Sequence, residues 1–259
     1  DVFMNTWWKK RLKRIIQQSN MLLRIYYWLK PPRPDQHNHL ILHYARTKGK
    51  QEVTFVQLGA HRGGLHDPLD RHIRLDGWKG LFVEPQIGEL NALQQHYHDF
   101  AGLHYAPVAI DPYETTKSFF SIKPAPGLPK WVTQLSSFYA AVPESIQDQF
   151  PQLEIEVQQV KCASLDELLI TYSIKKVDVL LLDTEGHDGV IIQSLNFASI
   201  SPDLILFEHY HLSDVDYQQS LQYLQRAGYS CWVQSPNTLA VRSPALLKAY
   251  EEVWMNPVP

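Results

Sequence analysis

The sequence has no long hydrophobic run and only two cysteines, and each shortage excludes a class of protein. No apolar stretch approaches the roughly 18 residues of a membrane-spanning helix, and the N-terminal segment lacks the uninterrupted apolar core of a secretory signal. Cys162 and Cys231 lie in apolar runs, with no second Cys or His at metal-finger spacing. We therefore expect reduced core cysteines and a cytoplasmic protein.

The chain also lacks internal repeats, low-complexity tracts and a strong overall charge. A net charge of -3 argues against a general nucleic-acid-binding protein. The charge is uneven, because residues 1–33 hold eight Lys or Arg and a single acidic residue. The rest of the chain is correspondingly acidic, and its 44% hydrophobic content is typical of a globular domain.

Residues 7–29 have the pattern of a basic amphipathic helix. Trp8, Leu12, Ile15 and Leu22 fall at helical spacing on one face, and Pro31 ends the pattern. Two interpretations stay open. The helix contacts a membrane surface peripherally, which would make the protein membrane-associated, or it docks on the protein's own core or on a second subunit in an oligomer. Residues 1–39 are predicted to be this helix and a linker, and residues 40–259 the main domain.

From residue 53 onward, short apolar runs alternate with amphipathic stretches, which is typical of βαβ units around a parallel sheet. Seven strands are predicted near residues 53–58, 79–84, 103–110, 177–183, 202–208, 229–234 and 238–242. Helices are predicted near 87–99, 164–173, 188–196 and 215–228, the second beginning at the N-cap Ser164. Residues 111–160 interrupt this alternation, and we expect an insertion with a hairpin-like element that shapes an acceptor site.

The stretch TFVQLGAHRGG, residues 54–64, runs a strand into a glycine loop. Its spacing is G-x-x-x-G-G, and His61 occupies the position where a dinucleotide loop needs its second glycine. The loop therefore favours a smaller anion, such as an amino-acid carboxylate, over a pyrophosphate. Glu84 ends the next strand and is suited to accept hydrogen bonds from ribose hydroxyls. The alternative is that the loop is only a tight turn.

Ionisable side chains follow two later strands. Asp183, Glu185, His187 and Asp188 come directly after the strand near 177–183, and Glu208, His209 and His211 follow the strand near 202–208. Such a concentration of charge at the carboxyl ends of strands is typical of an active site. The alternative is that these residues cap helices and connect loops.

The segments VQLGAHRGG, GLFVEPQ, YAPVAID, CASLDELL, VDVLLLDTEGHD and PDLILFEH, in this order, resemble the FkbM family of S-adenosylmethionine-dependent methyltransferases. The resemblance covers residues 54–241. The sequence departs from the family at His61, where Asn is usual, and at Gln57, where Asp is common.

The resemblance implies an α/β, Rossmann-like class I methyltransferase fold with a seven-stranded, mostly parallel sheet and an antiparallel last strand. It implies S-adenosyl-L-methionine as the cofactor and methyl transfer to a hydroxyl of a sugar, glycan or natural product. The residues then expected at the cofactor are Gln57, Gly59, Ala60, His61, Gly63, Glu84, Pro85, Val108, Ala109 and Asp183.

Methyl transfer to an alcohol calls for a general base. Our first hypothesis is His187, supported by Asp183 and Glu185, and the second is His209 or His211. A metal ion held by Asp183, Glu185, His187 and Glu208 is a further alternative, and the spacing leaves the need for a metal unknown.

Two other classes of function stay open. A degenerate methyltransferase fold could serve as a non-catalytic scaffold. An NAD-dependent sugar-modifying enzyme shares the strand, glycine loop and acid layout, although His61 and the lack of a suitably placed Tyr-x-x-x-Lys pair disfavour it. The expected partner is a small-molecule or glycan acceptor, with no nucleic acid.

Overall fold

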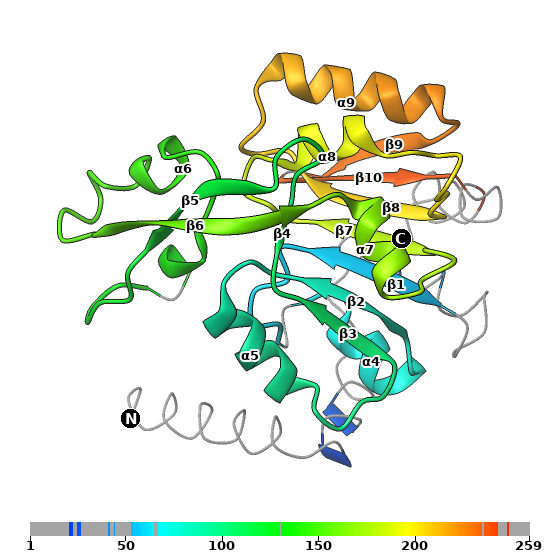
Figure 1. The fold of residues 1–259 in the computed structure, drawn as a ribbon, viewed down its shortest axis with the longest axis horizontal. Helices are drawn as coiled ribbons and strands as arrows, with labels where there is room; N and C mark the ends of the chain where they lie inside the picture. The colour runs from blue at the N-terminus through cyan, green and yellow to red at the C-terminus, as the bar shows by residue number, and fades with distance from the viewer. Residues whose placement is uncertain are drawn as a thin grey trace, which may run out of the picture.

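The computed structural model describes residues 53–64, 67–129, 131–234 and 236–242, with the single positions 21, 22, 25, 26, 41, 44 and 248. Its centre is a seven-stranded sheet with the order β3-β2-β1-β7-β8-β10-β9 (Figure 1). β10 pairs antiparallel with both neighbours, and the other adjacent strands of this sheet run parallel. This topology confirms the predicted class I methyltransferase fold.

The strands of this sheet are β1 (Thr54–Leu58), β2 (Lys79–Val83), β3 (Leu103–Ala106), β7 (Val179–Leu182), β8 (Leu204–Glu208), β9 (Ser230–Gln234) and β10 (Asn237–Val241). The helices packed around it are α4 (Asp70–Asp76), α5 (Ile87–His96), α7 (Leu165–Thr171), α8 (Asp188–Ser194) and α9 (Asp214–Arg226). The seven predicted strands and four predicted helices are therefore present. Ser164 caps α7 in a reciprocal box with Glu167, as the sequence predicts.

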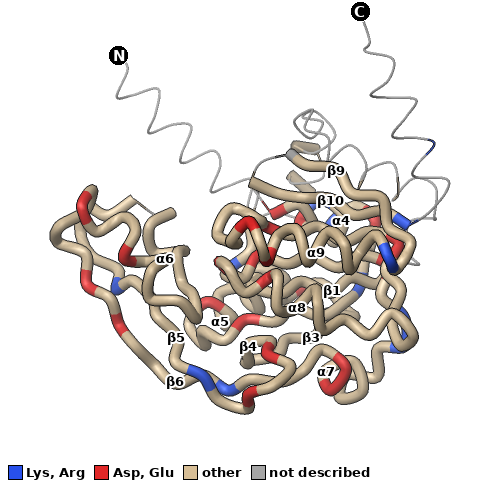
Figure 2. Tube along the Cα trace, turned by 90° about the horizontal axis from the view of Figure 1, so that it is seen from above, with Lys and Arg blue, Asp and Glu red and all other residues tan. Residues whose placement is uncertain are grey.

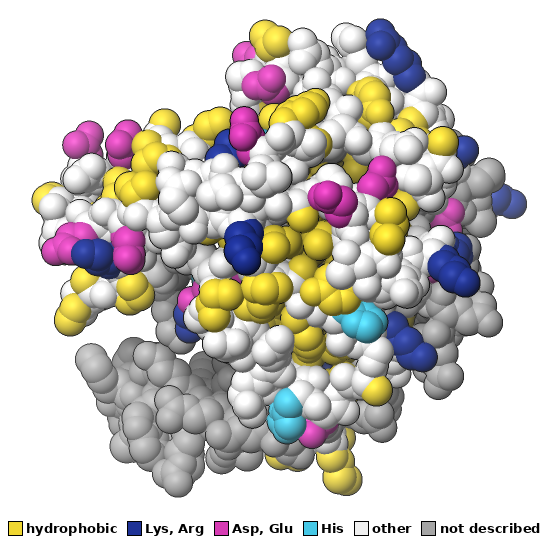
Figure 3. All heavy atoms as spheres, in the orientation of Figure 1, with side chains coloured by type: hydrophobic (Ala, Val, Ile, Leu, Met, Phe, Trp, Pro, Cys, Tyr) yellow, Lys and Arg dark blue, Asp and Glu magenta, His cyan; other side chains and the backbone are white. Residues whose placement is uncertain are grey.

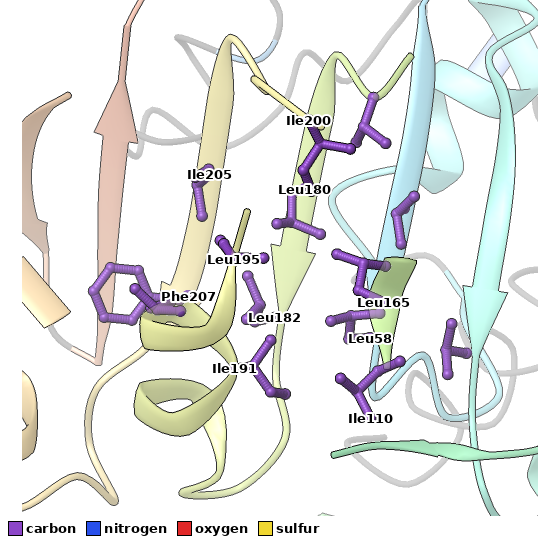
Figure 4. Packing of buried hydrophobic residues seen from close by; sticks show 14 of the residues in the cluster. Leu58, Ile110, Leu165, Leu180, Leu182, Ile191, Leu195, Ile200, Ile205 and Phe207 are labelled. Atoms are coloured by element: carbon purple, nitrogen blue, oxygen red, sulfur yellow. The ribbon is translucent and has the colours of Figure 1, made fainter. Parts of the chain in front are cut away.

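Each face of the sheet has its own core, because successive side chains of a strand point to opposite faces. On one face Phe55 and Leu181 pack with residues of α4 and α5. On the other face Leu180 and Leu182 pack with α7, α8 and α9. Figure 4 shows Leu182 of β7 lying close to Ile191 of α8. Strands covered on both faces explain the nearly continuous apolar runs in the sequence.

The interruption between residues 111 and 160 forms an arm that projects beyond the main sheet in both views (Figures 1 and 2). β5 (Thr116–Ile122) and β6 (Ile155–Ala163) pair antiparallel along the arm. The one-turn segments η1 (Val132–Gln134) and α6 (Ala141–Glu144) lie between them in the chain. The base of β6 also pairs with β4 (Ala109–Ile110), which connects the arm to the end of β3.

The structure differs from the sequence prediction in two described elements. The predicted strand at 103–110 is split into β3 and β4, which belong to different sheets, because Pro107 has no N–H to continue the ladder. Helix α4 was not predicted, because its buried Asp70 and Arg74 form an ion pair, with Nε and Oδ1 2.9 Å apart, where an apolar stripe would be expected.

The predicted helix over 7–29 lies outside the described residues, apart from four helical positions at 21, 22, 25 and 26. Neither the division at residue 40 nor the membrane interpretation is tested by the structure, and both stay predictions. Within the described part of the chain, no helix has the length and apolar character that a membrane crossing requires. Cys162 and Cys231 are free thiols in β6 and β9, as predicted, but both are only partly buried instead of lying in the core.

Candidate active site

A cavity opens where β1, β2 and β7 end at the same edge of the sheet, with the arm forming its opposite wall. This edge is where ligands bind in doubly wound α/β folds. Seven of the ten residues expected at the cofactor line it: Gly59, His61, Glu84, Pro85, Val108, Ala109 and Asp183. On the face of the molecule shown in Figure 3, hydrophobic side chains gather where the arm meets the main sheet.

Gly59 begins the loop after β1 and has a φ of 74°. A Cβ added here would lie 1.8 Å from the backbone oxygen of Asp183, at the end of the neighbouring strand. Glycine is therefore required so that the ends of β1 and β7 can lie side by side and present both loops to one cavity. The position also has the left-handed backbone that side chains disfavour.

Glu84 lies directly after β2 and is only 3% exposed. Its Oε2 accepts a hydrogen bond from the backbone N–H of His61 at 2.8 Å, and its Oε1 accepts one from Gln86 N at 2.9 Å. Burial raises the pKa of Glu84 to about 7. A carboxylate oxygen has a second lone pair, so both oxygens retain the capacity to accept from a ligand in the cavity.

His61 has a φ of 46° and lies between the loop, the arm and α5. Its Nε2 is 3.2 Å from Oε2 of Glu89, and its Nδ1 lies 3.5 Å from Nε2 of Gln134, a residue of the arm. Glu89 also accepts from Arg62 Nε at 2.6 Å. Burial lowers the pKa of His61. The ring therefore forms part of the cavity wall, at the junction of the cofactor loop and the arm.

Three of the residues expected at the cofactor, Gln57, Ala60 and Gly63, are not among the residues that line the cavity. Gln57 donates from Nε2 to Asp67 at 3.1 Å, inside the fold. Ala60 is buried in the core. A Cβ on Gly63 would lie 2.7 Å from Cδ1 of Leu93, so this glycine lets the loop pack closely against α5. The second glycine of the motif thus serves packing, which the spacing alone could not distinguish from ligand binding.

His187 lines the cavity but is only 2% exposed, and both of its ring nitrogens have close neighbours. Nε2 lies 3.1 Å from Oδ2 of Asp111, and Nδ1 lies 3.2 Å from the hydroxyl of Tyr139. Asp111 also accepts from Nζ of Lys117 at 2.7 Å. Burial and then the charge of Lys117 lower the pKa of His187 to about 4. The ring is therefore neutral near pH 7, and the carboxylate beside it is Asp111, where the sequence suggested Asp183 and Glu185.

Asp183 lies directly after β7, and its side chain is exposed within the cavity. No hydrogen bond to its carboxylate is formed by the described residues. Desolvation by the surrounding protein and then the charge of Glu185 raise the pKa of Asp183 above its ordinary value. Asp188, by contrast, is fully buried and accepts from the hydroxyl of Thr184 at 2.7 Å, so it stabilises the turn. Asp183 is thus the carboxylate of this strand end that is open to a ligand.

Glu185, Glu208 and His211 come together beside Asp183. Nε2 of His211 lies 3.0 Å from Oε2 of Glu185. Burial and then the charge of Asp183 raise the pKa of Glu208 to about 9. His209 is not among the cavity-lining residues; its Nδ1 is 2.9 Å from the hydroxyl of Thr238, and its ring stacks on Tyr217. Of the two histidines proposed as second choice for the base, only His211 lies near the acidic cluster.

Several cavity-lining residues were not predicted from the sequence. They come from the arm, from strand ends or from the turns after them: Leu58, Val83, Gln86, Ile110, Phe119, Gln134, Ser136 and Thr184. The arm residues carry no motif, so only the folding of β5 and β6 brings them to the cavity. Asp111 was visible as an acid after a strand, but nothing in the sequence paired it with His187, 76 positions later.

The cavity suits a nucleoside that carries an amino-acid-like group. Glu84 offers buried carboxylate oxygens at one side, and Val83, Val108 and Ile110 offer apolar surface next to it. Asp183, without a hydrogen-bond partner among the described residues, offers an acceptor for a cationic group. These are the contacts that the ribose, the adenine and the amino end of S-adenosylmethionine need, so the residues present fit this cofactor.

Comparison with protein families matches residues 57–231 to the methyltransferase FkbM domain, which is more than half of the chain. No curated protein sequence matches the chain. Among solved structures, the FkbM methyltransferase of Methylobacillus flagellatus KT is similar at 13% identity, with a TM-score of 0.42, over 74% of this chain and 44% of that one. An RNA methyltransferase from Salinibacter ruber in complex with S-adenosyl-L-homocysteine is similar at 10% identity, with a TM-score of 0.39, over 81% of this chain and 90% of that one. Fibrillarin of Aeropyrum pernix with bound S-adenosyl-L-methionine is similar at 12% identity, with a TM-score of 0.37, over 74% of this chain and 67% of that one.

Proposed function

The chain belongs to the FkbM family of S-adenosylmethionine-dependent methyltransferases, and we propose that it methylates a hydroxyl of a sugar, glycan or natural product. The observation that supports this proposal is Asp183, an exposed carboxylate at the edge of the sheet that lines the same cavity as the residues suited to the cofactor and the residues of the arm. When bound, S-adenosylmethionine supplies an electrophilic methyl group on a sulfonium sulfur.

On the cofactor side, Glu84 would accept hydrogen bonds from the ribose hydroxyls. Two backbone N–H groups already hold its carboxylate in place. Val108 and Ala109 would hold the adenine, and Gly59 and His61 would hold the methionine part, since all four line the cavity. Because these groups are fixed by β1, β2 and β4, little side-chain freedom is lost when the cofactor binds.

On the acceptor side, the arm supplies Phe119, Gln134, Ser136 and Phe138. Aromatic rings beside amide and hydroxyl groups suit a ligand with both apolar faces and hydroxyl edges, such as a sugar ring or a hydroxylated natural product. Trp131 and Tyr139 are partly exposed on the same arm, at 48% and 41%. A small molecule or the end of a glycan is therefore the proposed partner.

For proton removal, we assign the acceptor role to Asp183 in place of His187. The carboxylate of Asp183 reaches the cavity and has no hydrogen-bond partner among the described residues. His187 is enclosed between Asp111 and Tyr139. A buried, neutral imidazole whose Nδ1 is hydrogen-bonded to the hydroxyl of Tyr139 is suited to hold that hydroxyl beside the cavity, and we assign His187 this positioning role. Much of the rate enhancement then comes from alignment of the two bound partners.

The test begins with calorimetry of S-adenosyl-L-homocysteine binding to the intact chain, with NAD as the competing ligand class. It continues with transfer of a radiolabelled methyl group to a panel of sugars and hydroxylated natural products. Asp183→Asn should lower turnover by about 10²-fold or more, whereas Glu154→Gln, on an exposed surface pair, should leave it unchanged. Binding of NAD in place of the homocysteine derivative, or full turnover in Asp183→Asn, would contradict the assignment.

A further inference from the structure

Three side chains next to the cavity form a cluster with the composition of a metal site. Glu185, Glu208 and His211 each offer one ligand atom, and these atoms all lie within 4.8 Å of one another. Among the described residues this is the one group of three or more His, Cys, Asp or Glu with that geometry. It differs from the set suggested by the sequence, because His187 faces Asp111 and not Glu185.

Two neighbouring strands and the turns after them build this cluster. Glu208 is the last residue of β8, and His211 lies in the turn that follows. Glu185 lies in the turn after β7, the strand that pairs with β8. Next to it, a Cβ added at Gly186 would lie 3.3 Å from Cβ of His211, so glycine allows the two turns to pack closely. The register of β7 and β8 thus fixes the three ligands relative to one another.

Two carboxylate oxygens of the cluster are left without hydrogen bonds. Oε2 of Glu185 and Oε2 of Glu208 are shielded from solvent, and neither accepts a hydrogen bond from any described residue. Nε2 of His211 is only 3.0 Å from Oε2 of Glu185, yet this contact lacks hydrogen-bond geometry. Buried acceptors without donors are costly, because the water lost on burial is not replaced. A cation between them would satisfy both oxygens at once.

One separation within the cluster agrees with two ligands that share an ion. Neighbouring ligands on an octahedral ion with bonds of about 2.1 Å lie roughly 3.0 Å apart. The separation between His211 and Glu185 has this value. Two carboxylates with one imidazole suit a first-row divalent ion such as Mn²⁺ better than Ca²⁺, which prefers oxygen ligands alone. Three protein ligands also leave coordination positions open for a substrate or water.

We propose that Glu185, Glu208 and His211 bind a divalent transition-metal ion, with Glu185 placing it at the wall of the methyl-transfer cavity. The role assigned to the ion rests on the proposed O-methyl transfer: the ion would coordinate the acceptor oxygen and lower the pKa of the acceptor hydroxyl. Asp183, two positions before Glu185, then receives the proton. The ion site itself is defined by the three side chains and does not depend on which acceptor is used.

The experiment measures ion binding directly and separately from turnover. The intact chain is treated with a chelator, dialysed, and titrated with Mn²⁺ while free Mn²⁺ is followed by electron paramagnetic resonance. We expect one ion per chain, and at least a tenfold weaker affinity in Glu208→Gln and in His211→Ala. Glu154→Gln, which changes an exposed glutamate of the arm, is the matched control. Circular dichroism and calorimetry with S-adenosyl-L-homocysteine establish that each variant is folded and binds the cofactor product.

The outcomes separate the ion site from the proposed function. Loss of Mn²⁺ binding in both folded variants, with the control unchanged, supports the site. No binding to the wild-type chain at millimolar Mn²⁺ or Zn²⁺, or equal binding in wild type and both variants, overturns it and leaves a Glu–His contact without a metal. Failure of the proposed function appears differently, as ion binding without methyl transfer to any hydroxyl.

Discussion

The burial of Glu84 makes cofactor affinity depend on pH. Burial raises the pKa of this carboxyl group to about 7, so in the free protein it is substantially protonated below neutral pH. Ribose hydroxyls donate to the carboxylate, and therefore bind the ionised form preferentially. The sign follows: affinity is highest above pH 7 and falls as the pH decreases through 7.

The magnitude follows from the ionised fraction. With a pKa of about 7, the ionised fraction of Glu84 falls from roughly nine tenths at pH 8 to roughly one tenth at pH 6. If only this form binds well, the dissociation constant rises about tenfold over this range, which corresponds to about 1.4 kcal/mol. The carboxylate and ammonium groups of the ligand's amino-acid end keep their charges over most of this interval, so the change reports mainly on the protein.

The assay is calorimetry with S-adenosyl-L-homocysteine at several pH values, on wild type, Glu84→Gln and the surface control Glu154→Gln. We expect Glu84→Gln to bind more weakly at pH 8 and to have a shallower pH dependence than wild type, since its amide does not titrate whereas Asp183, whose pKa is also raised, still does. The control should keep the wild-type profile. The same slope in Glu84→Gln as in wild type would refute the reasoning, and so would tight wild-type binding that does not change between pH 6 and pH 8.

Three further predictions concern the framework of the site. Gly59→Ala should lower the free energy of unfolding in urea by at least about 3 kcal/mol, because the added Cβ meets the backbone at the end of β7. Gly88→Ala, with open space around it, should cause no such loss, and equal stability of the two variants would disprove the steric argument. Tyr139→Phe removes the hydroxyl next to His187 and should reduce turnover about tenfold with unchanged affinity for S-adenosyl-L-homocysteine; unchanged turnover would remove the pair from the mechanism. Burial opposes ionisation of Asp111, but its ion pair and backbone hydrogen bonds hold its pKa below the ordinary value. The stabilisation by ionised Asp111 is therefore present above the ordinary carboxyl pKa and is lost as the pH falls through the lowered pKa. Asp111→Ala should lower the free energy of unfolding by about 2–3 kcal/mol near pH 7. A smaller decrease at pH 3 is the check.

Much of the sheet could be predicted from the sequence because its signals are local. Runs such as VDVLLLD are apolar at consecutive positions, which is typical of strands covered on both faces. Ser164 and Glu167 are three residues apart, and this spacing alone predicts the start of α7. The resemblance to the family supplied the seven-stranded sheet with its antiparallel last strand, and the strand order came only from the structure. Helix α4 was not predicted because its buried face consists largely of paired charged side chains, which hydrophobic periodicity cannot detect.

Within the site, the sequence predicted which strand ends matter and could not predict how their side chains pair. Gly59, Glu84 and Asp183 each follow a strand that runs to the same edge of the sheet, so their approach to one cavity follows from topology. The neighbour of His187 was expected among the acids adjacent in sequence. In the structure the ring turns to Asp111, because the arm covers that side of it and excludes water.

By itself the sequence determined the sheet, the cofactor class and the acidic edge, since these depend on spacing within single segments and on a family pattern. Only the tertiary structure decided that Gly63 packs against α5, that His187 is enclosed by the arm, and that His211 lies next to Glu185. Each of these contacts joins segments at least 26 residues apart in the chain. Their geometry depends on helix packing and strand register, which arise only when the whole domain folds.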